Sequence, residues 1–237
     1  MISEDSLLRR LPILLNKKQA LFLDGIRHAS ELSHYAYVRL AESLAEIAVD
    51  ARYQQEGGSF THPFLDAWAV VDGIDRLRSL LKLMPGLKFA PVQPGETTFF
   101  ERTQPIRDLR NVADHLAQRA DYVIARNGTA LGILSWITPL GDDNKRARSS
   151  VILPGTLPEF SQPFVQPVGQ KIERPSDQIV LAAGEYSASL SDVIRDSARM
   201  VNRLEETLAN YLAESGHNTE SRGSDVLISV DLEFEQA

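Results

Sequence analysis

The sequence has 237 residues, of which 43% are hydrophobic and 24% are charged, and 32 acidic against 25 basic residues give a formal net charge of −7. A chain of this length can bury a core without disulfides, and the absence of cysteine excludes thiolate zinc sites, iron–sulfur clusters and thiol nucleophiles. The acidic balance argues against broad attraction to nucleic acid or to anionic membranes, so any site for a polyanion must be local.

The N-terminal residues do not resemble a secretion signal. Glu4 and Asp5 stand where such a signal carries positive charge, and Arg9, Arg10 and Pro12 interrupt the apolar run. No window offers the ~20 uncharged apolar residues of a membrane span. We therefore expect a cytoplasmic protein without membrane contact.

One long amphipathic helix is predicted over residues 17–53, which contain no proline and one glycine, Gly25. Ser33 occupies a position in its apolar stripe, and Gly57 and Gly58 end it. At about 1.5 Å per residue this helix is roughly 55 Å long, further than the next helix can cover. Another element of the chain or a second copy must pack on the remainder. The stripe consists of Phe22, Ile26, Ala29, Tyr37, Leu40, Leu44 and Ile47.

Two more helices are predicted in the first half of the chain. One spans residues 63–84, and a proline-rich connector over 85–103 predicts a long irregular loop, of the kind that is often functional. Thr103 is the predicted N-cap of the next helix, over 104–126, which an Asn-Gly pair ends. The apolar positions are Phe64, Trp68, Val71, Ile74 and Leu81, then Leu109, Ala113, Leu116, Ala120 and Val123.

From residue 129 the apolar period changes to two, which is typical of strands. Residues 129–137 and 146–153 flank a turn at 141–144 and predict an antiparallel hairpin. A further strand is predicted over 178–186, and five prolines make 154–175 irregular.

The C-terminal part combines a helix, a linker and a strand. Residues 191–215 predict a fourth helix, with its stripe at Ile194, Val201, Leu204, Leu208 and Tyr211. The polar residues 217–224 predict a linker, and the alternation over 225–234 predicts a half-buried strand.

These elements predict a mainly α protein: a bundle of about four helices with a small antiparallel β embellishment, α+β overall. The division we expect is a helical bundle over 1–126, a β-rich insertion over 127–188, the fourth helix over 189–216, and a linker with a C-terminal strand over 217–237.

The common catalytic motifs are absent from the sequence, including phosphate loops, metalloprotease and EF-hand signatures and the hydrolase nucleophile elbow. Glu31 and His34 have the i, i+3 spacing of di-iron bundles, near Asp24 and His28. Such a centre needs a second Glu-x-x-His, which the chain lacks. We predict a solvated polar face here, with no metal and no cofactor.

One motif stands out in the helix predicted over 104–126, where Arg110 is followed at once by Asn111 and then by His115. This pattern resembles the active-site motif of the HEPN superfamily, helical-bundle proteins many of which are metal-independent endoribonucleases. Position 117 is Ala, where some HEPN toxins carry Tyr. The resemblance implies that the RNA 2′-OH attacks the adjacent phosphate, in a cleft that two protomers share.

The residue types suit that chemistry. His115 would move a proton near neutral pH, Arg110 would stabilise the charge on the phosphate, and Asn111 would orient either one. We expect three further side chains to bind RNA: Arg107, Gln118 and Arg119. The resemblance implies RNA as substrate, a homodimer and a neutralising protein partner, with no DNA.

A structural role is the alternative for the same residues. Arg110 and Asp114 are i, i+4 partners, which is the spacing of a helix-surface salt bridge, and His115 fits a helix interface equally well. The same spacing favours surface ion pairs over an active-site rim for Asp72, Asp75, Arg76 and Ser79.

Three functions follow from these alternatives. They are a toxin or antiphage-defence endoribonuclease with Arg110, Asn111 and His115 as catalytic residues, a non-catalytic interaction or scaffold protein, and a catalytically silent RNA binder of the HEPN type.

Overall fold

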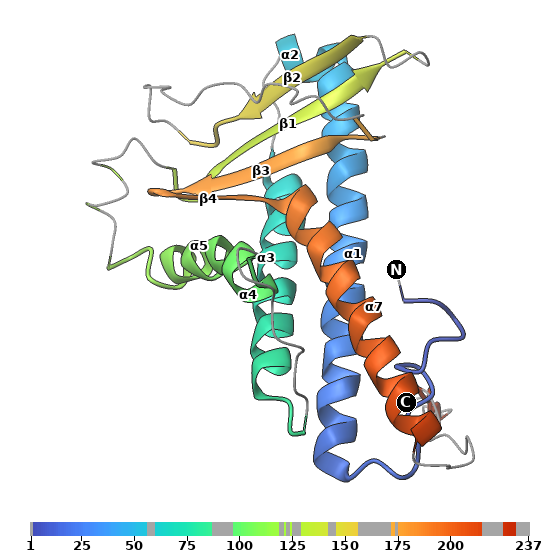
Figure 1. Ribbon diagram of the computed structural model, residues 1–237. Coiled ribbons are helices and arrows are strands. Elements are labelled where there is room, and N and C mark those ends of the chain that lie inside the picture. The colour runs from blue at the N-terminus through green and yellow to red at the C-terminus, as the bar shows by residue number, and fades with distance from the viewer. Residues whose placement is uncertain are drawn as a thin grey trace, which may run out of the picture.

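Three long helices lie side by side, and a four-stranded antiparallel sheet lies across one end of them, so the fold is α+β (Figure 1). The structure is a computed structural model that describes residues 2–55, 60–86, 97–118, 121, 124, 129–141, 146–155, 172–173, 175–214 and 225–230. None of the described helices is long and apolar enough to cross a bilayer.

Helix α1 (Lys17–Val49) begins at a capping box: the Asn16 side chain accepts from the Gln19 N–H, and the Gln19 side chain accepts from the Asn16 N–H. It ends at Asp50, whose backbone is extended. The Asp50 carboxylate accepts from the Arg52 N–H at 2.8 Å, so a local side-chain bond replaces the helical one. The single helix predicted over 17–53 is therefore two helices, α1 and α2 (Ala51–Gln55).

Helix α3 (Thr61–Leu83) packs along α1 and confirms the second predicted helix. The two helices lie close together at Gly73, where an added Cβ would lie 2.2 Å from the Ser33 Oγ. Ser33 thus keeps its place in the apolar stripe because it is small and because its hydroxyl donates to the Ala29 carbonyl at 2.6 Å. The helix stops where predicted, with Gly86 in the left-handed region at φ +80°.

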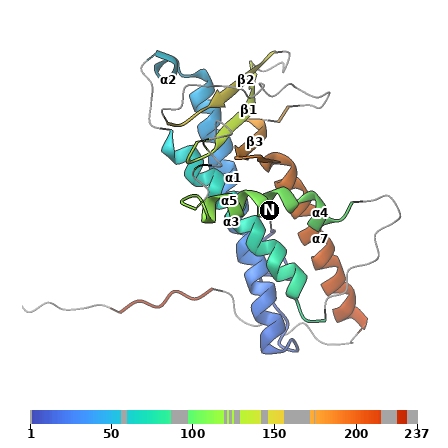
Figure 2. The same ribbon diagram turned by 90° about the vertical axis from the view of Figure 1, so that its left-hand side faces the viewer.

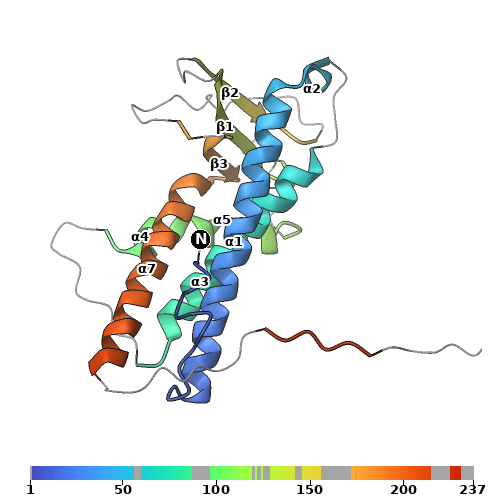
Figure 3. The same cartoon turned by 90° about the vertical axis from the view of Figure 1, so that its right-hand side faces the viewer.

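Helix α7 (Leu190–Glu214) is the predicted fourth helix, and it lies beside α1 (Figures 1 and 3). Together with buried side chains of the N-terminal segment it covers the length of α1 that α3 leaves open; these are Leu8, Leu11 and Leu15. The Tyr37 hydroxyl of α1 donates to the Ser191 Oγ of α7 at 2.8 Å. Other elements of the same chain thus pack on α1 beside α3.

The sheet has the order β2-β1-β3-β4, with all neighbours antiparallel. Its strands are β1 (Ile133–Leu140), β2 (Arg146–Ile152), β3 (Asp177–Ala183) and β4 (Tyr186–Ser189). The predicted hairpin is confirmed, with Leu134 opposite Ile152 and Leu140 opposite Arg146. The single strand predicted over 178–186 is a hairpin, because Gly184 turns the chain at φ +61°, and β4 leads directly into α7.

The segment before the sheet contains two short helices, α4 (Phe99–Arg102) and α5 (Gln104–Asp114). The prediction of one continuous helix over 104–126 is wrong, since the His115 and Leu116 N–H groups both turn back to the Ala113 carbonyl and α5 ends at Asp114. Residues 121 and 124 are helical again, and the others from 119 to 126 lie outside the described residues. Thr103 is not a side-chain cap: its hydroxyl donates to the Phe99 carbonyl at 2.6 Å and accepts from Arg78.

The C-terminal segment, residues 225–230, runs away from the helical body without secondary structure (Figures 2 and 3). Its apolar side chains are 78–90% exposed, so the predicted half-buried strand is wrong for these residues. A strand needs a partner strand, which the alternation of residue types does not supply.

Several predictions fall outside the described residues: Gly57 and Gly58, 87–96 and 156–171 in the irregular connectors, the turn at 142–144, the linker over 217–224, and 231–234.

Candidate functional site

Helix α5 carries the motif residues on a side that faces solvent. Its apolar side, formed by Ile106, Leu109 and Val112, is buried against the rest of the molecule, with α3 and β4 as its main neighbours. Asn111 and His115 are exposed on the opposite side. This strong separation of polar and apolar sides explains why so short a helix holds its place.

A buried carboxylate of α3 holds the two arginines of α5. Asp75 is 3% exposed, and it accepts from the Arg110 Nη1 at 2.8 Å and from the Arg107 Nη1 at 3.2 and 3.4 Å. The Arg110 Nε also lies 3.5 Å from Asp72 and 3.6 Å from Asp114. Asp75 thus belongs to an interhelical ion pair, and not to a surface pair within its own helix.

The electrostatics at Arg110 follow from these neighbours. Burial acts to lower the pKa of the guanidinium, but the hydrogen bond that it donates to Asp75 and the charges of Asp72, Asp75 and Asp114 outweigh burial and raise that pKa above its ordinary value. Three carboxylates therefore face the two arginines, and both cations are already neutralised where the motif would receive a phosphate.

The predicted site residues do not converge in one cluster. Arg107 and Arg110 meet on Asp75, whereas Asn111 and Gln118 are exposed, and His115 is the exposed C-cap of α5. Within the described residues no hydrogen bond joins the His115 or Asn111 side chain to Arg110. Arg119 lies outside the described residues.

A buried cation that the sequence did not reveal fixes the start of α5. Arg78 of α3 is 8% exposed, and it donates to the Phe100 carbonyl at 2.6 Å, to the Gln104 Oε1 at 3.0 Å and to the Thr103 hydroxyl. Burial lowers its pKa. Its hydrogen-bond partners are a backbone carbonyl and neutral side chains some 25 residues away, which a single sequence does not reveal.

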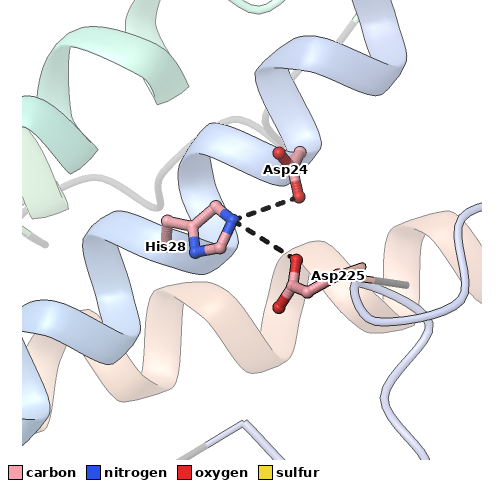
Figure 4. Close-up of side chains that lie close together, drawn as sticks. All are labelled: Asp24, His28 and Asp225. Atoms are coloured by element: carbon pink, nitrogen blue, oxygen red, sulfur yellow. Dashed lines mark ion pairs between the residues drawn. The ribbon is translucent and has the colours of Figure 1, made fainter. Parts of the chain in front are cut away.

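The residues considered for a metal site are engaged in other interactions. Glu31 forms ion pairs with Arg9 and with Arg27. His34 lines a small cavity together with Ser30 and Asn202. Asp24, His28 and Asp225 each offer one ligand atom, all within 4.8 Å of one another (Figure 4).

A metal ion does not fit among Asp24, His28 and Asp225, because Arg27 already stands between them. Its Nη2 lies 2.6 Å from Asp225, 3.0 Å from Asp24 and 2.8 Å from the His28 Nε2. A divalent cation there would face a guanidinium at contact distance, so this arrangement anchors Asp225 to α1 and does not point to a metal centre.

His34 gives a prediction for stability against pH. It lines a cavity of about 30 Å³ with Ser30 and Asn202, and burial lowers its pKa below the ordinary value of 6.5. Its contribution to stability is fully present above pH 6.5 and is lost as the pH falls through 6.5 towards the lower pKa of the folded state. We expect urea unfolding between about pH 7.5 and about pH 5.5 to show less acid destabilisation in His34→Gln than in wild type. The exposed His115→Gln is the control, and equal acid sensitivity of wild type and His34→Gln would contradict the assignment.

Comparisons with protein-family models, with curated proteins and with solved structures find no match to this chain.

Proposed function

We propose that this protein is a non-catalytic interaction module with a HEPN-like helical body, in which the Arg-Asn-x-x-x-His motif has a structural role. One observation carries the proposal: the Arg110 guanidinium forms an ion pair with the buried carboxylate of Asp75. Asp75 needs that cation, because a buried unpaired carboxylate is strongly destabilising. Arg110 neutralises the buried Asp75 carboxylate, so its guanidinium is not available to a scissile phosphate.

Charge around the motif supports the same proposal. A phosphodiester that approaches Arg110 also meets Asp72 and Asp114, which lie 3.5 and 3.6 Å from its Nε. Close like charges repel, and RNA affinity depends on cations that remain free to replace counterions. The polar side of α5 is thus better suited to a protein surface of mixed charge than to RNA.

Exposed apolar side chains supply the capacity for interaction. Val226, Leu227, Ile228 and Val230 are exposed within one short segment, and Leu21, Leu32 and Tyr35 are exposed on α1. Apolar residues that gather on a surface mark interaction sites. A homodimer or a neutralising protein partner fits this proposal.

A metal-independent endoribonuclease is the second candidate function. The observation in its favour is that Asn111 of α5 and His115, the C-cap of that helix, are both open to solvent, where RNA can reach them. In this candidate His115 transfers protons while Arg110 leaves Asp75 for the phosphate.

An RNA digestion assay separates the two candidates. Wild type, His115→Ala and Arg110→Ala are incubated with total RNA and EDTA, and the fragments and their termini are identified. We expect no cleavage by any of the three. Fragments with 2′,3′-cyclic phosphate from wild type and from the control His62→Ala, an exposed histidine on α3, but not from His115→Ala, would overturn the proposal in favour of the ribonuclease.

A further inference from the structure

The C-terminal segment 225–230 carries the features of a strand without a partner. Val226, Ile228 and Val230 alternate with other residues, so all three project to one side when the segment is extended. They are 79%, 83% and 78% exposed, and the Arg27–Asp225 ion pair fixes the start of the segment on α1. An exposed segment of this kind is a ready template for pairing with a sheet edge.

The sheet offers one suitable edge. β4 at one end is short, and α5 packs beside it. At the other end β2 is seven residues long and, among the described strands, pairs only with β1. A cavity of about 270 Å³ lies beside β2, lined by Tyr53, Phe60, Trp136, Ile152 and others. For scale, a cavity of roughly 150 Å³ already holds a benzene molecule, so this one has room for aliphatic side chains.

The charges of β2 and of the C-terminal sequence from Asp225 onward are complementary. β2 carries Arg146, which is exposed, and Arg148. The segment begins at Asp225, and the sequence after it continues with Asp231, Glu233 and Glu235. In a chain of net charge −7, a basic edge strand is a local exception that favours an acidic partner.

The segment cannot reach β2 of its own chain while Asp225 stays on Arg27. Arg148 donates to the Ala48 carbonyl, which places β2 at the far end of α1 from Arg27. The helix rises about 1.5 Å per residue, so Arg27 and Ala48 are about 30 Å apart. The five residues after Asp225 extend only about 17 Å.

The geometry points to a second copy of this chain as the occupant of β2: the C-terminal segment of one copy adds to β2 of another as a further strand, and its apolar side chains enter the cavity. This inference names the partner of the interaction module proposed above and rests on that proposal. The basic side chains of β2 favour the acidic C-terminal sequence to which the segment belongs.

The test measures the mass of the full chain by light scattering and sedimentation over a range of concentrations. We expect wild type to self-associate, and Val226→Asp/Ile228→Asp to raise the dissociation constant more than about 100-fold, because carboxylates would enter an apolar cavity. Ser229→Asp adds a similar charge on the opposite side and should associate as wild type does. Arg146→Glu should weaken association about 10-fold, and added salt should reduce its difference from wild type.

A peptide experiment identifies the surface directly. A fluorescent peptide of residues 225–236 should bind the Val226→Asp/Ile228→Asp protein, whose β2 would not be occupied by a second copy, and should bind poorly when Arg146→Glu is added. A monomeric wild type, an association that the Val226→Asp/Ile228→Asp variant retains, or a peptide that does not bind would each overturn the inference. RNA cleavage is measured separately on α5, so failure of the proposed function and failure of this dimer give different results.

Discussion

Gly73→Ala is expected to lower the free energy of unfolding by about 1–3 kcal/mol, although alanine is the better helix former. The added Cβ would lie 2.2 Å from the Ser33 Oγ and 3.3 Å from the Ala29 carbonyl oxygen. Ser33 is 1% exposed, so its hydroxyl must leave the Ala29 carbonyl inside the core or the two helices must separate. Urea denaturation followed by circular dichroism measures the loss.

Two further variants test the reason for that loss. Ser33→Ala removes the atom that clashes, so Ser33→Ala/Gly73→Ala should be more stable than Gly73→Ala alone, with a coupling of about 1 kcal/mol or more. Gly25→Ala is the matched control in α1: its Cβ meets the end of the Leu80 side chain at 3.1 Å, which can move, so we expect no comparable loss. Additive effects of Ser33→Ala and Gly73→Ala would contradict the close approach.

Substitution of both arginines that bind Asp75 is expected to lower the free energy of unfolding more than Gly73→Ala does. Arg107→Ala/Arg110→Ala leaves a carboxylate with a 5% exposed side chain without the two arginines that donate to it, which should cost about 3–5 kcal/mol. Arg110→Ala alone should cost about 1.5–3 kcal/mol, because its 2.8 Å bond is the shorter one and Arg107 remains. The same urea denaturation reports both values.

Asp75→Asn distinguishes a charge effect from lost packing. Added to Arg107→Ala/Arg110→Ala, it removes the unpaired charge and should recover a large part of the stability. The exposed Asn111→Ala, next to Arg110 in the chain, is the control and should stay within about 0.5 kcal/mol of wild type. If Arg110→Ala unfolds at the wild-type urea concentration, Asp75 does not need its guanidinium and the ribonuclease candidate gains support.

The long helices could be predicted because each buries one side against a partner that runs along most of its length. The positions of Leu40 and Leu44 in α1, or of Leu204 and Leu208 in α7, follow the helical period because of that one-sided burial. The break at Asp50 was not predicted, since it depends on one side-chain bond to the Arg52 N–H.

Other errors arose where distant parts of the chain decide the structure. Ala113 fits the apolar stripe of α5 but is exposed, and α5 ends one residue later. Val226 and Ile228 have the alternation of a strand, yet a strand also needs the edge of a sheet to pair with, and that edge lies far away in the sequence.

The candidate site was recognised from three residues close together in the sequence, and its geometry depends on a fourth that is distant. The motif identified Arg110, whereas its strongest partner, Asp75, lies 35 positions earlier on another helix. The i, i+3 and i, i+4 spacings around Asp75 predicted surface pairs, because a single sequence shows neighbours within a helix and not across helices.

The length of α1 links the symmetry of any assembly made through the C-terminal segment to the relative direction of the two α1 helices. The anchor at Arg27 and the β2 edge near Ala48 are about 30 Å apart on one continuous helix. When the α1 helices of two copies are antiparallel, each Arg27 lies beside the β2 strand of the other copy. Each C-terminal segment then pairs with the other copy's β2, and the assembly closes as a two-fold dimer. Copies that point the same way leave one segment and one β2 unfilled at the ends and grow into a filament. The masses measured by sedimentation therefore report the relative direction of the two α1 helices.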